Sequence, residues 1–304
     1  MDLVVVLIKQ NLVMLVYMMI GFVLFKKKML GKQGSADLSR VLLYVVLPVS
    51  IMRAYIVDYS VEMLKALGFS FLAAVIALML SVVVTRLLFH STEPVERFGT
   101  TFSNAGFIGI PLIQMTMGQE AVFYASSFIA LLNIAQWTYG VVLFTGTKES
   151  LSFRKIRTNP IILAFLAGVV LFFLPIKLPE TVSGMISTIA TMNGPIAMIV
   201  LGTYLAQLPL KEVFRGWIVY RASLVRLLVV PVLTVLAFAL LPAQFHDMKL
   251  AVLISASAPI GSNVAIFAQL YDQDYTLAVR EVCVTTVLSI ASMPLVMMLA
   301  NWLL

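Results

Sequence analysis

The chain has 304 residues, of which 61% are hydrophobic and 12% are charged, and its mean hydropathy is +1.02. Soluble domains carry about twice that share of charge, so the composition excludes an ordinary soluble protein and indicates a membrane protein. The net charge of +7 does not indicate nucleic-acid binding, because the basic residues cluster in short loops between apolar runs. A single cysteine, Cys283, rules out an intrachain disulfide.

The first apolar run predicts a membrane span rather than a secretory signal peptide. Asp2 stands where a signal peptide carries basic residues, the run is too long, and no small-residue cleavage site follows it. Further apolar runs along the chain are long enough to cross a bilayer as helices. We therefore predict an all-α membrane protein with ten transmembrane helices. The predicted spans are residues 3–25, 38–57, 62–89, 97–117, 119–146, 159–175, 181–206, 216–241, 249–270 and 275–303.

The basic residues of the loops predict the orientation, since loops on the cytoplasmic side of a membrane carry an excess of Lys and Arg. With the N-terminus outside, the inward loops hold most of the loop cations, and the even number of spans places the C-terminus outside as well. The inward cations are Lys26, Lys27, Lys28, Lys32, Arg40, Arg86, Arg97, Lys148, Arg154, Lys155, Arg157, Lys211 and Arg215.

Two pairs of short motifs predict an inverted repeat. VLPVSIM at 46–52 resembles NGPIAMI at 193–199, and SNAGFIGIPLIQ at 103–114 resembles APIGSNVAIFAQ at 258–269. Five spans separate the members of each pair, and because five is odd, the second half must lie inverted relative to the first. We predict repeats over residues 1–148 and 149–304, an arrangement that many secondary transporters use.

The fourth and ninth predicted spans both contain residues that break helices. Proline removes a backbone donor and glycine loosens the backbone, so both spans should open and expose peptide groups. In a membrane such backbone survives only inside protein or beside a wet cavity. We expect Pro111 and Pro259 to start second half-helices, whose N-terminal ends attract a carboxylate. The other reading is a pair of packing kinks. The predicted substrate-binding residues are Asn104, Gly106, Gly109, Pro111, Pro259, Gly261, Ser262 and Asn263.

These motifs, together with LLNIAQWTYGVVL at 131–143 and TNPIILAFLAGVVL at 158–171, resemble the auxin efflux carrier family, which also includes malate and malonate carriers. The resemblance covers nearly the whole chain. It implies a scaffold domain from spans 1, 2, 6 and 7 and a transport domain from spans 3–5 and 8–10, which moves as an elevator. It also implies homodimers that form through the scaffold, and it matches the asparagine that contacts the substrate carboxylate to Asn104.

Two features depart from the family pattern. Ala105 stands where relatives often have a hydroxyl residue, which argues against auxin itself as the substrate. The fold of the family also resembles that of sodium–bile-acid symporters, but the second broken span here has no acidic residue to serve as a sodium ligand. Sodium coupling is therefore weakly supported, and a sodium-coupled symporter is the nearest alternative.

Ionisable residues inside spans are functional candidates. Arg280 and Glu281 are neighbours in the tenth span and so lie on different helix faces. Glu281 is a candidate to exchange a proton, although the two side chains could also simply hold helices together. Arg226, deep in the eighth span, could balance a second carboxylate of a dicarboxylate substrate. Asn133 and Gln136 are three residues apart, share a helix face, and could line the site or bond between helices.

The sequence predicts no enzyme and no cofactor. His90 and His246 fall in loops on opposite sides, and one cysteine cannot supply a metal cluster. No nucleotide-binding motif or nucleophile–base arrangement is present. We predict a secondary active transporter of small organic anions in the cell membrane, working by alternating access. A membrane receptor that binds an organic acid without moving it is the alternative from another class.

Overall fold

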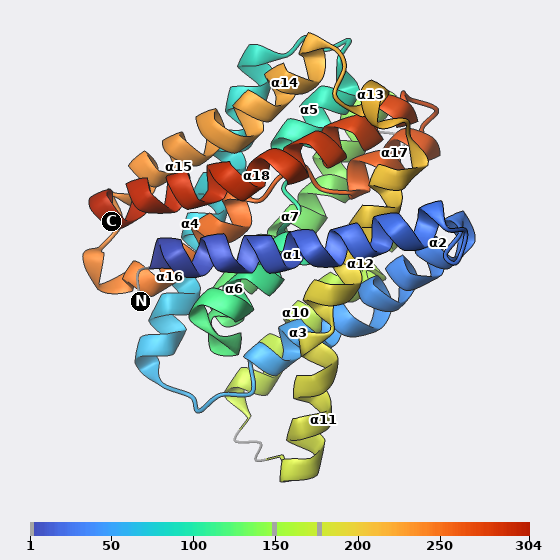
Figure 1. The fold of residues 1–304 in the computed structure, drawn as a ribbon. Coiled ribbons are helices and arrows are strands. Elements are labelled where there is room, and N and C mark those ends of the chain that lie inside the picture. The colour runs from blue at the N-terminus through green and yellow to red at the C-terminus, as the bar shows by residue number, and fades with distance from the viewer. Residues whose placement is uncertain (1–2, 148–150, 175–177) are drawn as a thin grey trace.

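The computed structural model describes residues 3–147, 151–174 and 178–304. Within these ranges the chain forms helices and no β-strand, and a single isolated antiparallel bridge joins Ser103 to Ile260. Some of the helices run side by side in a similar direction, and others cross them at an angle (Figure 1). The all-α class that the sequence predicts is confirmed. Lys148 and the predicted boundary between the repeats lie outside the described residues.

The first half of the chain supplies the helices that cover predicted spans 1 to 5. Short π-helical or 3₁₀ segments, marked η, interrupt several of them. Its elements are α1 (Leu3–Lys26), α2 (Lys32–Val41), η1 (Leu42–Val46), α3 (Leu47–Ala54), α4 (Val61–Leu88), α5 (Pro94–Thr101), η2 (Ala105–Gly109), α6 (Ile110–Met117), η3 (Gln119–Ala121), α7 (Val122–Ala135), η4 (Gln136–Gly140) and α8 (Val141–Thr145).

The second half supplies the helices that cover predicted spans 6 to 10. Its elements are α9 (Phe153–Arg157), α10 (Pro160–Phe173), α11 (Glu180–Thr191), α12 (Asn193–Gln207), α13 (Leu210–Val213), α14 (Trp217–Leu224), η5 (Val225–Val229), α15 (Val230–Phe238), η6 (Ala243–Phe245), α16 (His246–Ser257), α17 (Asn263–Leu270) and α18 (Tyr275–Leu303).

Among the described residues, six continuous helices are long and apolar enough to cross a membrane. Three shorter apolar helices add to them: Leu12–Lys26, Ala105–Met117 and Pro160–Phe173. The fourth and ninth predicted spans fall below the length of a span because each is broken in two. A multi-pass membrane protein follows from these helices, whereas ten crossings in two inverted repeats stay a prediction. The six long helices are Lys32–Ala54, Val61–Leu88, Gln119–Thr145, Glu180–Gln207, Trp217–Phe238 and Tyr275–Leu303.

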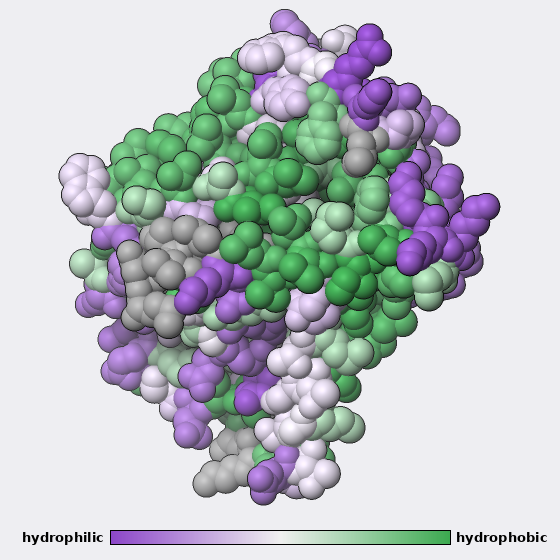
Figure 2. All heavy atoms as spheres, in the orientation of Figure 1, coloured by the Kyte–Doolittle hydropathy of each residue, from purple (hydrophilic) through white to green (hydrophobic). Residues whose placement is uncertain are grey.

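The exposed surface over α1, α15 and α18 is strongly apolar, as Figure 2 shows by the green area across the middle of the molecule. Large apolar side chains there point away from the protein, among them Val16, Leu236 and Leu295, which are between 50% and 58% exposed. So much exposed apolar area is costly in water, and lipid chains are the solvent that removes the cost. Hydrophilic residues gather at the end of the molecule that carries α2 (Figure 2).

Helices α1 and α12 pack backbone to backbone where they cross (Figure 1). Gly21 and Gly202 make this possible, because a Cβ atom at Gly21 would lie 2.0 Å from the Ile199 carbonyl oxygen and one at Gly202 would lie 1.9 Å from that of Met18. Small residues allow such close approach between membrane helices, where packing drives association. These two helices belong to the predicted scaffold. The division into scaffold and transport domains stays a prediction.

Candidate functional site

The two broken helices meet at their breaks. Helix α5 ends at Thr101, and the chain runs through residues 102–104 before the second half begins with η2 and α6. Helix α16 ends at Ser257, and residues 258–262 connect it to α17. The connecting segments pair, since the Asn104 N–H donates to the Pro259 carbonyl at 2.8 Å and the Gly261 N–H donates to the Phe102 carbonyl at 3.1 Å. Each segment therefore satisfies peptide groups that the other leaves open.

Gly261 and Gly109 are required by this close crossing. A Cβ atom at Gly261 would lie 3.0 Å from the Ser103 carbonyl oxygen, and one at Gly109 would lie 3.2 Å from the Cα atom of Ser255. A larger residue at either position would push the two broken helices apart. Both glycines were predicted at the site, and the structure places both between the crossing segments.

The two prolines differ in position. Pro259 sits in the connecting segment before α17 rather than at the start of that helix, where it was expected. Pro111 stands in the first turn of α6, which continues the π-helical η2, and π-helical bonds run from the Gly109 N–H to the Asn104 carbonyl and from the Ile110 N–H to the Ala105 carbonyl. The next bond would join residue 111 to Gly106, but proline has no N–H to give. The wide π turn accommodates the ring, and the Gly106 carbonyl is left free for another donor.

That donor comes from Asn193, which the sequence did not single out. Its Nδ2 atom donates to the Gly106 carbonyl at 3.0 Å, and its side chain is fully buried. Asn193 opens the NGPIAMI motif at the start of α12, so the motif that revealed the repeat also carries the contact. Helix α12 thereby touches the crossing at the carbonyl that Pro111 leaves free.

A cavity of about 30 Å³ lies at the crossing, room for about one water molecule. Asn104 is 5% exposed, and its Nδ2 atom has no hydrogen-bond partner among the described residues. A buried amide donor without a partner costs free energy, and a ligand oxygen in the cavity would remove that cost. Among the residues that the structure describes, no charged side chain lines this cavity. Its lining includes Leu47, Ser103, Asn104, Gly106, Asn133, Gly261, Ser262 and Asn263.

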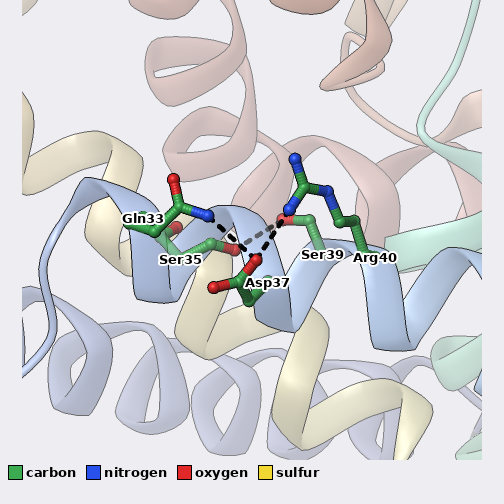
Figure 3. A network of polar contacts seen from close by, with 5 residues as sticks. All are labelled: Gln33, Ser35, Asp37, Ser39 and Arg40. Carbon is green, nitrogen blue, oxygen red and sulfur yellow. Dashed lines mark hydrogen bonds and ion pairs between the residues drawn. The ribbon is translucent and has the colours of Figure 1, made fainter.

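A larger vestibule of about 500 Å³ adjoins the small cavity, and Phe107, Ser262 and Asn263 line both. Lys32 and Arg40 line it on the side of α2. Figure 3 shows the polar face of α2, where Asp37 accepts hydrogen bonds from Gln33 at 3.1 Å and from Arg40 at 2.8 Å. Asp37 offsets part of the charge of Arg40, and with Lys32 the vestibule lining keeps a net positive charge that favours the entry of anions.

Asn133 and Gln136 lie beside the crossing. The Asn263 Nδ2 atom donates to the Gln136 Oε1 atom at 2.8 Å. Asn133 lines the small cavity, donates to the Ile129 carbonyl at 2.8 Å and accepts from Asn159. Gln136 thus holds the first residue of α17, whereas Asn133 lines the small cavity and bonds to its own helix and to Asn159.

The position of Arg226 differs from the one expected, in which its side chain faces the substrate. It lines neither cavity, it is 1% exposed, and its guanidinium donates only to backbone carbonyls. Its Nε atom donates to Ala258 at 3.0 Å, its Nη1 atom to Thr100 at 3.2 Å, and its Nη2 atom to Ala256. The breaks leave these carbonyls without backbone donors. The Arg226 side chain lies behind the crossing and supplies the donors instead.

Glu281 and Arg280 do not form an ion pair with each other. Glu281 is fully buried, neither of its carboxyl oxygens has a partner among the described residues, and a Cβ atom at Gly99 would lie 2.9 Å from its Oε2 atom. Arg280 points instead toward Gly216 at the start of α14. The Thr285 hydroxyl donates to the Glu281 carbonyl and accepts from the Ile260 N–H, which links Glu281 to the second break.

Comparisons with known proteins find transporters. A family described as "Membrane transport protein" matches residues 6–297. A protein of Rhizobium meliloti named "Putative malonate transporter" is 27% identical over 208 residues, which are 65% of this chain and 64% of that protein. An "Uncharacterized transporter" of Methanothermobacter thermautotrophicus is 26% identical over 299 residues, which are 92% of this chain and 94% of that protein.

The match to the family extends over both broken helices and all but the ends of the chain. It is a family of transporters and not of enzymes, in agreement with the sequence. The chain belongs to the membrane transport protein family, which is the auxin efflux carrier family that its motifs resemble.

Proposed function

We propose that this protein is a secondary active transporter of small organic anions, which bind where the two broken helices cross. The observation that carries the proposal is the buried, unpartnered Nδ2 donor of Asn104, which lines a cavity between the N-terminal ends of two half-helices. Each such end carries about half a positive charge. A carboxylate that places one oxygen in this cavity, with the rest of the molecule in the adjoining vestibule, accepts a hydrogen bond from Asn104 and offsets the charge of both helix ends.

The substrate class that we propose is a small mono- or dicarboxylate, with malonate as the first compound to test. The lack of charged side chains in the small cavity suits a single carboxylate bound by amides and helix ends. Lys32 and Arg40 in the vestibule suit a second carboxylate during entry. The relative from Rhizobium meliloti carries malonate in its name, and the chain spans 64% of the length of that relative.

The transport cycle that we propose is an elevator motion of one domain against a scaffold. In this proposal the scaffold holds α1, α2, α3, α10, α11 and α12, forms the homodimer, and stays fixed in the cell membrane with both termini outside. Its contacts with the crossing include the hydrogen bond from Asn193 to the Gly106 carbonyl and the close packing of Gly194 on Pro111, where a Cβ atom at Gly194 would lie 3.2 Å from the Pro111 Cβ atom. In the proposed motion these contacts break and reform as the crossing slides past the scaffold.

The energy source that we propose is a proton gradient, with Glu281 as the group that exchanges the proton. An ionised carboxylate without a partner is costly inside a protein, so a buried and unpartnered Glu281 can bind and release a proton with a change of environment. In the described part of the chain, neither the small cavity nor the vestibule is lined by an acidic residue that would serve as a sodium ligand. Sodium coupling is the alternative that the experiment must separate.

Uptake into proteoliposomes tests the proposal. The purified protein is reconstituted, and the uptake of radiolabelled malonate is measured with an imposed pH gradient, with a sodium gradient, and with neither, while unlabelled mono- and dicarboxylates compete. Concentrative uptake driven by the pH gradient is the expected result. No flux of any carboxylate, together with saturable binding in detergent, would contradict transport and favour a receptor. Uptake that only a sodium gradient drives would contradict proton coupling.

A further inference from the structure

Four backbone carbonyls converge on one buried guanidinium behind the crossing. The carbonyls of Thr100 and Thr101 belong to the last turn of α5, and those of Ala256 and Ala258 belong to the C-terminal end of α16. Arg226 reaches all four from η5, the π-helical segment in the middle of the eighth predicted span. A single side chain therefore binds the C-terminal ends of both first half-helices.

The charges of these groups balance. The C-terminal end of a helix carries about half a negative charge, so two converging ends carry about one. The guanidinium carries one positive charge and offers five N–H donors in a fixed plane, which suits several carbonyls at once. No carboxylate is hydrogen-bonded to Arg226 in the described part of the chain. The helix ends are its counter-charge.

The N-terminal ends at the same crossing have no such partner. The η2–α6 run begins beside Asn104 and α17 begins beside Ser262, and no acidic side chain lines the small cavity between them. About one positive charge is thus left open to the cavity. The two sides of the crossing differ for this reason: a cation of the protein binds the carbonyl side, whereas no acidic side chain among the described residues lines the N–H side.

Carbonyls freed at the breaks of discontinuous membrane helices, and the C-terminal ends of half-helices, are where secondary transporters of other folds hold coupling cations such as Na⁺. We propose that Arg226 is the resident cation of this crossing, occupying the carbonyl cluster in place of a bound Na⁺ and leaving only an anion site open. The inference rests on the proposed function, because the anion that binds the open site is the transported substrate of that proposal. It makes Arg226 a positioning residue that acts through the helix ends and never touches the substrate.

Filling the carbonyl cluster with a cation from solution distinguishes a role of Arg226 in transport from a role in folding. Without the guanidinium, four buried carbonyls lose their donors, and a small cation from solution can replace it. The variants are Arg226→Ala, Arg226→Lys and, as the matched control, Arg221→Ala. Arg221 lies five residues earlier on α14, pairs with Glu93 and does not reach the carbonyl cluster.

Two measurements are made on each variant, in sodium, choline and guanidinium chloride. The first is malonate uptake in proteoliposomes, and the second is the melting temperature in detergent, which needs no transport. Wild type should give the same uptake in sodium and in choline. Arg226→Ala should lose about tenfold or more of the uptake, and guanidinium should restore part of the uptake and raise the melting temperature of this variant alone. The uptake by Arg226→Lys should lie between the uptake by wild type and that by Arg226→Ala, because an ammonium is a point charge that cannot reach four carbonyls.

Several results would overturn the inference. One is wild-type uptake that requires sodium, and another is a melting temperature of wild type that sodium raises over choline at equal ionic strength. A third is an Arg226→Ala protein that transports like wild type in every salt. If no carboxylate is transported or bound by wild type, the proposed function fails, and the effects of guanidinium and sodium on the melting temperatures still decide the role of Arg226. If Arg226→Ala does not fold, Arg226→Lys and the wild-type salt comparison decide it.

Discussion

The backbone N–H of Asn104 donates to the carbonyl of Pro259 at 2.8 Å, and this bond joins the break of one helix to the break of another. The backbone of Asn104 thus serves the fold, whereas its side-chain amide lines the cavity with an unpartnered donor. The two roles lie on different atoms of one residue. A substitution that shortens the side chain separates them.

Replacing Asn104 by Ala should lower malonate uptake by about tenfold or more while the protein stays folded. The variant loses the amide donor to the carboxylate, and a hydrogen bond to a charged group contributes about 1.5–3 kcal/mol. The backbone bond to Pro259 remains, so the melting temperature should change little. Initial uptake rates in proteoliposomes, at matched protein content, check the expectation.

Asn301→Ala is the matched control for this prediction, because Asn301 is an exposed residue at the end of α18 that does not line the small cavity. It should transport like wild type. Wild-type uptake by the Asn104→Ala protein would remove Asn104 from the substrate site. A large fall in its melting temperature would show instead that the side chain serves the fold.

Glu281→Gln should abolish the dependence of uptake on a pH gradient while preserving exchange of labelled for unlabelled substrate. Glutamine keeps the shape of the side chain but cannot exchange a proton. The charged groups whose fields reach Glu281 are Glu96, Arg221, Arg280 and Asp274, and none of them is changed. Uptake driven by imposed pH gradients, compared with exchange at equal pH, gives the measurement.

The control for Glu281 is Glu120→Gln, which changes an exposed carboxylate that borders neither the small cavity nor the vestibule. That variant should respond to pH gradients like wild type. If Glu281→Gln is driven by the pH gradient as strongly as wild type, the proton binds elsewhere.

Sequence reasoning found the crossing but placed its parts imperfectly. Glycine and proline in the fourth and ninth spans predicted the breaks, because these residues act on the backbone of their own helix. The exact breaks depend on other helices: Pro111 follows a π-helical run whose free Gly106 carbonyl is bound by Asn193. A contact between residues that lie 87 positions apart leaves no local signal in one sequence.

Arg226 shows the same limit for charged residues. Its depth in an apolar span indicated importance, and the sequence could offer only the substrate as its counter-charge, because no acidic residue stands nearby in the chain. The actual partners are backbone carbonyls at the ends of two other helices. Every residue has a backbone carbonyl, so no residue type reveals which ones Arg226 binds. For Glu281, by contrast, the sequence correctly placed it on a different face from Arg280, since that follows from helix geometry alone.

Gly202→Ala should destabilise the packing of α1 on α12. The added Cβ atom would lie 1.9 Å from the Met18 carbonyl oxygen, so the backbones must move apart, at a cost of about 1–3 kcal/mol. Gly184→Ala is the control, since nothing lies within 4 Å of a Cβ atom there and alanine favours a helix over glycine by about 1 kcal/mol. Melting temperatures in detergent should fall for the first variant and hold or rise for the second. The opposite order would contradict the close packing.

Glu93→Gln should lower the melting temperature at neutral pH and lose this effect in acid. Burial opposes ionisation of Glu93, but the His90 N–H, which donates to its Oε2 atom at 2.7 Å, and the Arg221 guanidinium outweigh burial and lower its pKa. A lowered pKa in the folded protein stabilises it above the ordinary carboxyl pKa, and this stability is lost as the pH falls through the folded value. The pair is partly exposed, so the effect should be below about 1 kcal/mol. The melting temperatures of the two proteins should therefore differ at pH 7 and converge as the pH falls from the ordinary pKa of a glutamate through the lowered pKa of Glu93. A constant difference across that range would show that the carboxylate charge is not the cause.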